Sequence, residues 1–114
     1  MKAISMKSPF GQLIRDGKKY IETRTWGTTY RGPLLFVCSK EPKSHESGMA
    51  LCVADLIMIR DMTPLDEEGA CCSIYPGAKA WILKNLRHIK PFPVKGQLGL
   101  FDVPDELIEE AADE

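Results

Sequence analysis

Hydrophobic residues along this chain fall into short runs that are separated by turns rich in glycine and proline. Apolar runs of this length predict β-strands. The predicted strands cover residues 2–6, 20–26, 34–38 and 49–60, a strand that begins near residue 80, and a last strand over 98–103. The run 49–60 is apolar on both faces except at Asp55, which predicts a central and bent strand. Pro91 and Pro93 predict an interruption before the last strand.

Helices are predicted at two or three places. Residues 9–17 carry an apolar stripe between Ser8, a cap residue, and Gly17, a stop residue. Residues 64–72 follow Thr63, and acidic side chains in their first turns complement the helix dipole. A proline then opens a weak helix in the acidic C-terminal segment.

Together these elements predict an α+β fold, namely a small mixed β-barrel of five to six strands with two or three short helices. The 114 residues are 44% hydrophobic, which is enough for one compact core. We therefore expect one domain over residues 1–103 and an acidic tail over residues 104–114.

The formal net charge is −1, but the charges are unevenly distributed. All 15 Lys and Arg residues lie within residues 1–103 with only 10 of the 16 acids, so that segment carries +5. Within residues 1–43, nine bases stand against three acids. A basic body favours a polyanionic partner such as RNA. The acidic tail is interpreted either as a solvated end or as an intramolecular competitor for the basic surface.

Cysteine and histidine spacing indicates no metal chemistry. The four cysteines form no C-x-x-C pair and the two histidines lie far apart in sequence, so we expect no metal site, no redox motif and no cofactor. The N-terminal residues lack the apolar run of a signal peptide, and no stretch reaches the ~18 apolar residues of a membrane span. The sequence therefore predicts a cytoplasmic protein that has no membrane partner.

The second predicted strand carries the densest chemistry. Side chains alternate along a strand, so Tyr20, Glu22, Arg24 and Trp26 should share one face, directly after Lys19. An arginine fork flanked by aromatic rings suits a planar ligand such as a nucleobase, or a nearby phosphate. The alternative is an ordinary Glu–Arg pair on a half-exposed strand, worth only ~0–1 kcal/mol.

Four segments share the order and spacing of one known family. They are the motif Gly17-x-Lys19-x-x-Glu22-x-Arg24-Thr25-Trp26 and the segments 30–40, 81–87 and 91–101. Together they resemble the ASCH domain, which belongs to the PUA-like superfamily. The resemblance covers about residues 2–103, and the motif is fairly specific in this order and context.

The resemblance implies a β-barrel with a cleft beside the motif strand, and a role in binding RNA or processing nucleosides. Some relatives are described as amidohydrolases that deacetylate 4-acetylcytidine with a lysine, a threonine and a glutamate, and others as ribonucleases. Lys19 matches that lysine, but Glu22 occupies the place of the nucleophilic threonine. A carboxylate is a poor replacement, because its attack on an amide gives a mixed anhydride. Glu67 and Glu68 are the nearest candidates by position for the third residue.

Other candidate ligand-binding residues are assigned by their chemistry. Trp26 and Tyr75 offer rings on which a base can stack. Arg31, Lys40 and Lys95 offer cations that can hold phosphate.

Two functions stay open at the level of sequence. In the first, the domain binds RNA or a modified nucleoside or nucleotide in a basic cleft beside the motif strand. In the second, it is a small hydrolase in which Lys19, Glu22 and Arg24 are the catalytic groups. We favour binding, because the sequence offers no Ser-His pair, no metal cluster and no placed nucleophile. Ser39 would end beside the motif if the two strands pair, and Trp81 lies in an alternating apolar run typical of a core.

Overall fold

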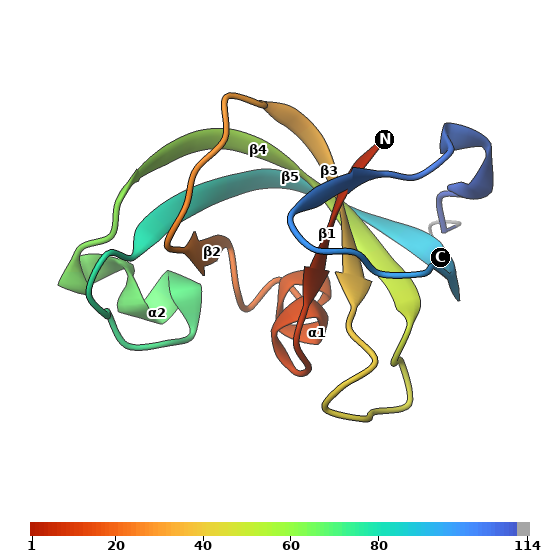
Figure 1. Ribbon diagram of the computed structural model, residues 1–114, viewed down its shortest axis with the longest axis horizontal. Helices are drawn as coiled ribbons and strands as arrows, with labels where there is room; N and C mark the ends of the chain where they lie inside the picture. The colour runs from red at the N-terminus through yellow and green to blue at the C-terminus, as the bar shows by residue number, and fades with distance from the viewer. Residues whose placement is uncertain (112–114) are drawn as a thin grey trace.

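A computed structural model of the chain describes residues 1–111. The strands are β1 (Lys2–Met6), β2 (Ile21–Arg24), β3 (Gly32–Cys38), β4 (Met49–Asp61), β5 (Lys79–Pro93) and β6 (Leu100–Asp102). The helices are α1 (Phe10–Arg15) and α2 (Glu67–Ala70), with 3-10 turns at Pro64–Asp66 and Asp105–Leu107. The six strands form one mixed sheet in the order β2-β5-β4-β3-β1-β6 (Figure 1). β1 and β3 are parallel, and the other neighbours are antiparallel.

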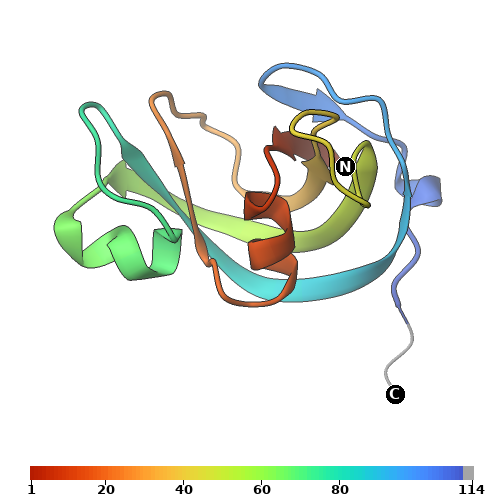
Figure 2. The same ribbon diagram turned by 90° about the horizontal axis from the view of Figure 1, so that it is seen from below.

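The sheet is strongly curved. β4 and β5, its longest strands with 13 and 15 residues, pair with three register shifts. Bulges of this kind bend a strand, and both strands curve around α1 and β1 (Figures 1 and 2). The α+β class is as predicted. Within residues 1–111, however, no pairing joins the edge strands β2 and β6, so the sheet is open and the predicted barrel is not confirmed.

β5 continues farther than the sequence predicts. Pro91 and Pro93 lie inside this strand instead of interrupting the chain, and Pro93 is in register with Met49 of β4. On the side of β5 that faces away from β4, β2 pairs only with residues 79–82. The second half of β5 is therefore not covered by β2 on that side. Proline, which has no N–H to donate, is tolerated at such an edge.

Both helices are shorter than predicted. α1 has six residues and buries Ile14 in the largest apolar cluster, together with residues of β1, β3, β4 and β5. The segment after Thr63 begins as a 3-10 turn, and α2 ends where Cys71 adopts a left-handed conformation with a φ of 55°.

The motif strand β2 has a different neighbour from the predicted one. It pairs with β5 in the register Glu22↔Trp81, so that β5 and β4 separate it from β3. The predicted alternation along β2 is observed for Ile21 and Arg24 but not for their neighbours, because the Tyr20 ring lies with Ile21 against Gly69 of α2, and Thr23 lines the same cavity as Arg24. Ile21 packs in an apolar cluster with Ala70 of α2, whereas Arg24 reaches toward β1. Trp81 is fully buried, which confirms its predicted place in the core.

The acidic segment after β6 returns to the sheet. Glu110 pairs with Ile89 of β5, and the N–H of Lys90 donates to the carbonyl of Glu109. This part of the tail lies against β5. Of the helices within residues 1–111, none is long and apolar enough to cross a membrane.

Candidate functional site

The candidate site lies where two parallel strands end. The N–H of Ser39, just after β3, donates to the carbonyl of Met6 at the end of β1. Beside these strand ends, a cavity of about 530 Å³ opens toward β2. This main cavity is lined by Ser5, Met6, Lys7, Phe10, Lys19, Glu22, Thr23, Arg24, Ser39, Cys72, Tyr75, Gln97, Leu98 and Gly99. Its volume is in the range of small-molecule sites, ~300–1,000 Å³.

A buried charge network forms one wall of the main cavity. The Glu22 carboxylate accepts the Nε–H of Arg24 at 2.8 Å and the backbone N–H of Thr23 at 2.9 Å. The Nζ of Lys19 lies 3.5 Å from the same carboxylate. Lys19 and Glu22 are only 2% and 5% exposed. One buried carboxylate thus holds two cations, and the network carries a net positive charge.

Lys19 is fixed from several directions. Its Nζ donates to the carbonyl of Ala70 in α2 at 2.5 Å and lies 5.3 Å from the centre of the Phe10 ring, within range of a cation–π interaction. α2 also receives the backbone N–H of Tyr20 at the carbonyl of Gly69. A Cβ at Gly69 would lie 2.5 Å from the Tyr20 ring, so the close approach of α2 to β2 depends on this glycine.

Arg24 spans the gap between β2 and β1. Its Nη2 donates to the carbonyl of Ser5 at 2.8 Å and approaches the sulfur of Met6 at 3.2 Å. Its side chain is 24% exposed, and its Nη1 has no hydrogen-bond acceptor within residues 1–111. Arg24 therefore offers a guanidinium edge that is held in place by the protein and is available to a ligand.

The loop between β5 and β6 closes the other side of the main cavity. Gly96 packs against β1, and a Cβ there would lie 2.8 Å from the Ser5 hydroxyl. That hydroxyl is buried and has no hydrogen-bond partner in the described part of the chain. Gln97 and Leu98 follow on the rim, and Leu98 is 99% exposed.

The structure gathers most, but not all, of the predicted site residues. Lys19, Glu22, Arg24, Ser39 and Tyr75 line the main cavity. Ser39 does so although β2 and β3 do not pair, because β1, the neighbour of β3, faces β2 across the cavity.

Four predicted residues line other surfaces. Lys40 and Lys95 line a second, adjoining cavity. The Trp26 ring instead packs edge-on against Trp81, with ring centres 5.0 Å apart. Arg31 donates to carbonyls of its own loop.

The two candidate glutamates of the hydrolase hypothesis do not line the main cavity. Glu67 accepts the backbone N–H of Ile74, and Glu68 is exposed on α2. Conversely, sequence analysis missed Ser5, Phe10 and residues 97–99. The only available signal was the pair of glycines at 96 and 99, which marks a turn but not the surface that the turn covers.

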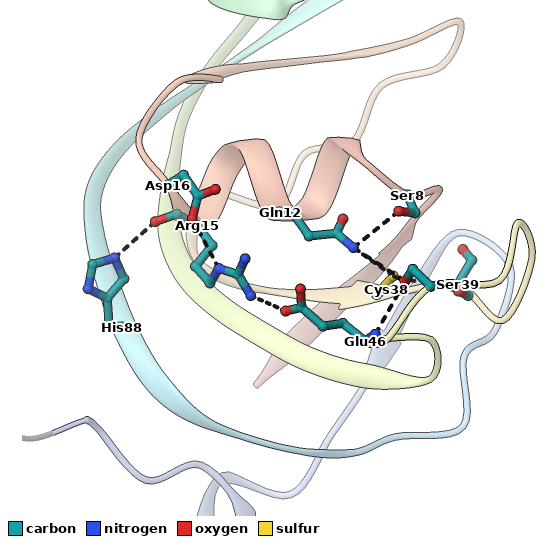
Figure 3. Close-up of polar contacts among 9 residues, drawn as sticks. Ser8, Gln12, Arg15, Asp16, Cys38, Ser39, Glu46 and His88 are labelled. Atoms are coloured by element: carbon teal, nitrogen blue, oxygen red, sulfur yellow. Dashed lines mark hydrogen bonds and ion pairs between the residues drawn. The ribbon is translucent and has the colours of Figure 1, made fainter.

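A polar cluster braces the loop between β3 and β4 against α1 (Figure 3). Arg15 of α1 forms an ion pair with Glu46 of that loop. The Gln12 side chain donates to Ser8 at 3.1 Å and lies near the sulfur of Cys38. These contacts hold the loop in place at the edge of the second cavity. Within residues 1–111, no group of three His, Cys, Asp or Glu side chains could hold a metal ion.

Comparison with known proteins identifies the family. The sequence profile of the ASCH domain matches residues 4–93, which is most of the chain. This protein belongs to the ASCH domain family. ASCH domains are PUA-like and are associated with RNA in general. A comparison with curated proteins finds no match.

Solved ASCH structures share the fold of this domain. The crystal structure of ASCH from Zymomonas mobilis is 18% identical, with a TM-score of 0.72, and the match covers 92% of this chain and 88% of that one. Two variants from the same organism also match, one with a tyrosine replaced by phenylalanine and one with a serine replaced by alanine. They are 17% and 15% identical, with TM-scores of 0.65 and 0.67, and the matches cover 92% of this chain and 91% and 89% of theirs. At such identities the likeness shows the fold alone.

Proposed function

We propose that this ASCH domain binds RNA, or a modified nucleoside or nucleotide, in the main cavity. The observation that carries the proposal is the fixed guanidinium of Arg24, whose Nη1 has no acceptor among the described residues and which lines the same cavity as the hydroxyl-bearing residues Ser39 and Tyr75. Nη1 carries two N–H donors, which can bond acceptors of a base edge or a phosphate with the strength of a charged donor.

The apolar part of the cavity complements this polar wall. Phe10 and Tyr75 contribute aromatic rings to the lining, and rings are platforms on which any base can stack, at ~1–3 kcal/mol per base. Three lining cations, Lys7, Lys19 and Arg24, stand against the one carboxylate of Glu22 among the described lining residues. The local charge therefore favours an anionic or electron-rich ligand.

The charge network supports binding over hydrolysis. Both oxygens of Glu22 accept hydrogen bonds from the protein, and Lys19 is held between Glu22 and a carbonyl. A carboxylate has about four lone-pair positions, and donors from Thr23, Arg24 and Lys19 face that of Glu22, so little of its acceptor capacity is left for a reacting hydroxyl or water. We therefore expect no release of acetate from 4-acetylcytidine by the native protein.

Ligand-induced thermal stabilisation tests this function, because a ligand that binds only the folded state raises the melting temperature. The native protein should be stabilised by short single-stranded RNAs or by nucleosides, and Arg24→Met should lose that response. Lys84→Met is the matched control, since Lys84 is an exposed lysine of β5 that lines neither cavity. Circular dichroism of each variant establishes that it is folded. If a folded Arg24→Met protein kept the full response, the main cavity would not be the binding site.

A further inference from the structure

We propose that the second cavity is a subsite for the neighbouring nucleotide of a single-stranded oligonucleotide, with Lys40 and Lys95 holding its phosphate. The subsite rests on the proposed function, because it extends a ligand that is already held in the main cavity. It predicts that the preferred ligand is an oligonucleotide instead of a free nucleoside.

The two cavities adjoin each other. The second cavity has a volume of about 370 Å³ and is lined by Ser5, Cys38, Ser39, Lys40, Gly48, Lys95, Gly96, Gln97 and Leu98. Four of these residues, Ser5, Ser39, Gln97 and Leu98, also line the main cavity. A chain that leaves the main cavity over these shared residues would therefore enter the second cavity next.

The charge of the second cavity fits a phosphate. Lys40 and Lys95 are exposed and form no ion pair with any residue in the range 1–111, and no described carboxylate lines the cavity. Outside the main cavity, three lysines form ion pairs: the half-buried Lys2 and Lys79 with Asp102 and Asp61, and the exposed Lys90 with Glu109. Two cations that line one cavity without a carboxylate beside them favour an anion there.

The walls of the second cavity are held in place before a ligand arrives. Lys40 precedes the loop that the Arg15–Glu46 ion pair ties to α1 (Figure 3). Lys95 precedes Gly96, whose close approach to Ser5 fixes the opposite loop. Preorganised walls reduce the ordering cost of binding.

Leu98 offers an apolar contact for a base, in addition to the lysines that would hold the phosphate. It is almost fully exposed on the ridge shared by the two cavities. An apolar side chain in this position can lie against the face of a base and separate two neighbouring bases. The ridge thus favours a dinucleotide unit over an isolated phosphate ion.

Fluorescence or calorimetric titration of the full chain tests the subsite with two ligand series, one of cytidine and one of adenosine. Each series contains the nucleoside, its 3′-monophosphate, the dinucleotide and the hexanucleotide. In at least one series the dinucleotide should bind about tenfold or more tightly than the nucleoside. In the Lys40→Ala/Lys95→Ala variant that gain should disappear, while the nucleoside Kd stays unchanged. Loss of one phosphate contact should also reduce the magnitude of the slope of log binding constant against log salt concentration by about 0.7. Lys84→Ala, which removes an exposed lysine outside both cavities, should leave every Kd unchanged.

The outcomes separate the subsite from the proposed function. A nucleoside that binds while the dinucleotide binds no more tightly would overturn the subsite and leave the main cavity's role intact. A dinucleotide gain that survives in the double-lysine variant would also overturn it. Displacement of the dinucleotide by inorganic phosphate at an equal concentration would reduce the cavity to an anion site and reject the nucleotide subsite. If no member of either series bound the native protein, the proposed function itself would fail.

Discussion

Replacing Glu22 by glutamine should destabilise the domain strongly, although the shape of the side chain hardly changes. The substitution removes one negative charge from a carboxylate that is 5% exposed and serves two cations. Glutamine can still accept a hydrogen bond from Arg24 or from the Thr23 N–H. It cannot neutralise Lys19, a residue that is only 2% exposed.

The size of the effect follows from this burial. Removing one partner from a buried ion pair costs ~3–5 kcal/mol, because it leaves an uncompensated charge away from water. Arg24 is about a quarter exposed, so solvent screens its half of the network and the expected cost is near the lower bound, about 3 kcal/mol. For a domain of this length, such a loss lowers the melting temperature by roughly 12 °C.

A double-mutant cycle distinguishes charge burial from simple loss of packing. Lys19→Met leaves the Glu22–Arg24 bond intact and deprives the Ala70 carbonyl of its donor, which costs about 1–3 kcal/mol. In the Glu22→Gln/Lys19→Met protein, the unpaired ammonium is gone. The double variant should therefore lose about 1–3 kcal/mol less than the sum of the two single losses.

Urea denaturation, followed by circular dichroism, measures all four proteins under one condition. The midpoint should shift while the denaturant slope stays constant, which indicates a change in stability and not in the denatured state. A Glu22→Gln cost below about 1 kcal/mol would show that the Lys19–Glu22 pair contributes no more than an exposed surface ion pair. Additivity of the two substitutions would show that Lys19 and Glu22 are energetically independent, and would refute the network.

Two further predictions concern titratable groups away from the cavities. Burial raises the pKa of the Cys52 thiol to about 12. Iodoacetamide at pH 8 should therefore modify the half-buried Cys71 and Cys72 in the folded protein and spare Cys52. Peptide mass mapping that finds Cys52 modified as fast as Cys71 and Cys72 would contradict this prediction. Hydrogen bonds from Arg60, and then from the backbone of Thr63, hold the pKa of Asp66 well below its unfolded value of ~3.9. The stabilisation that ionised Asp66 provides is therefore present above about pH 4 and lost as pH falls through the folded-state pKa. The difference in unfolding free energy between the native protein and Arg60→Ala should be constant from about pH 7 to 5 and shrink below about pH 4. A gap that does not change with pH down to about pH 2 would exclude Asp66 as the partner that Arg60 stabilises.

Local patterns were reliable guides to local structure in this chain. The strand Lys2–Met6 has the predicted bounds, and alternation along β2 places Glu22 and Arg24 on the same side, joined by a hydrogen bond. The alternation of side chains between the two faces of a strand depends only on local backbone geometry. The family could also be inferred, because each of the four segments that carry the resemblance is short and its residues are adjacent in the chain.

Non-local pairing could not be predicted in the same way. Nothing in the composition of β2 specifies that its partner is the first half of β5, some 60 residues later, because cross-strand packing depends on the partner as much as on the strand itself. The predicted interruption at Pro91 and Pro93 was wrong for the same reason, because their place within β5 depends on the partner strand. Residues 97–99 form a rim of the main cavity only because Gly96 lets the loop approach Ser5.

The pairing of the last strand with the first determines when the cavities can form during synthesis. Phe101 of β6 is in register with Ala3 of β1, and the rim residues 95–99 lie just before β6 in the chain. A nascent chain still lacking β6 has no partner to anchor that rim beside β1, although β2, β4 and α1 are already made. Both cavities should therefore be completed only after nearly the whole domain has left the ribosome, and until then β1 has one unpaired edge open to other chains.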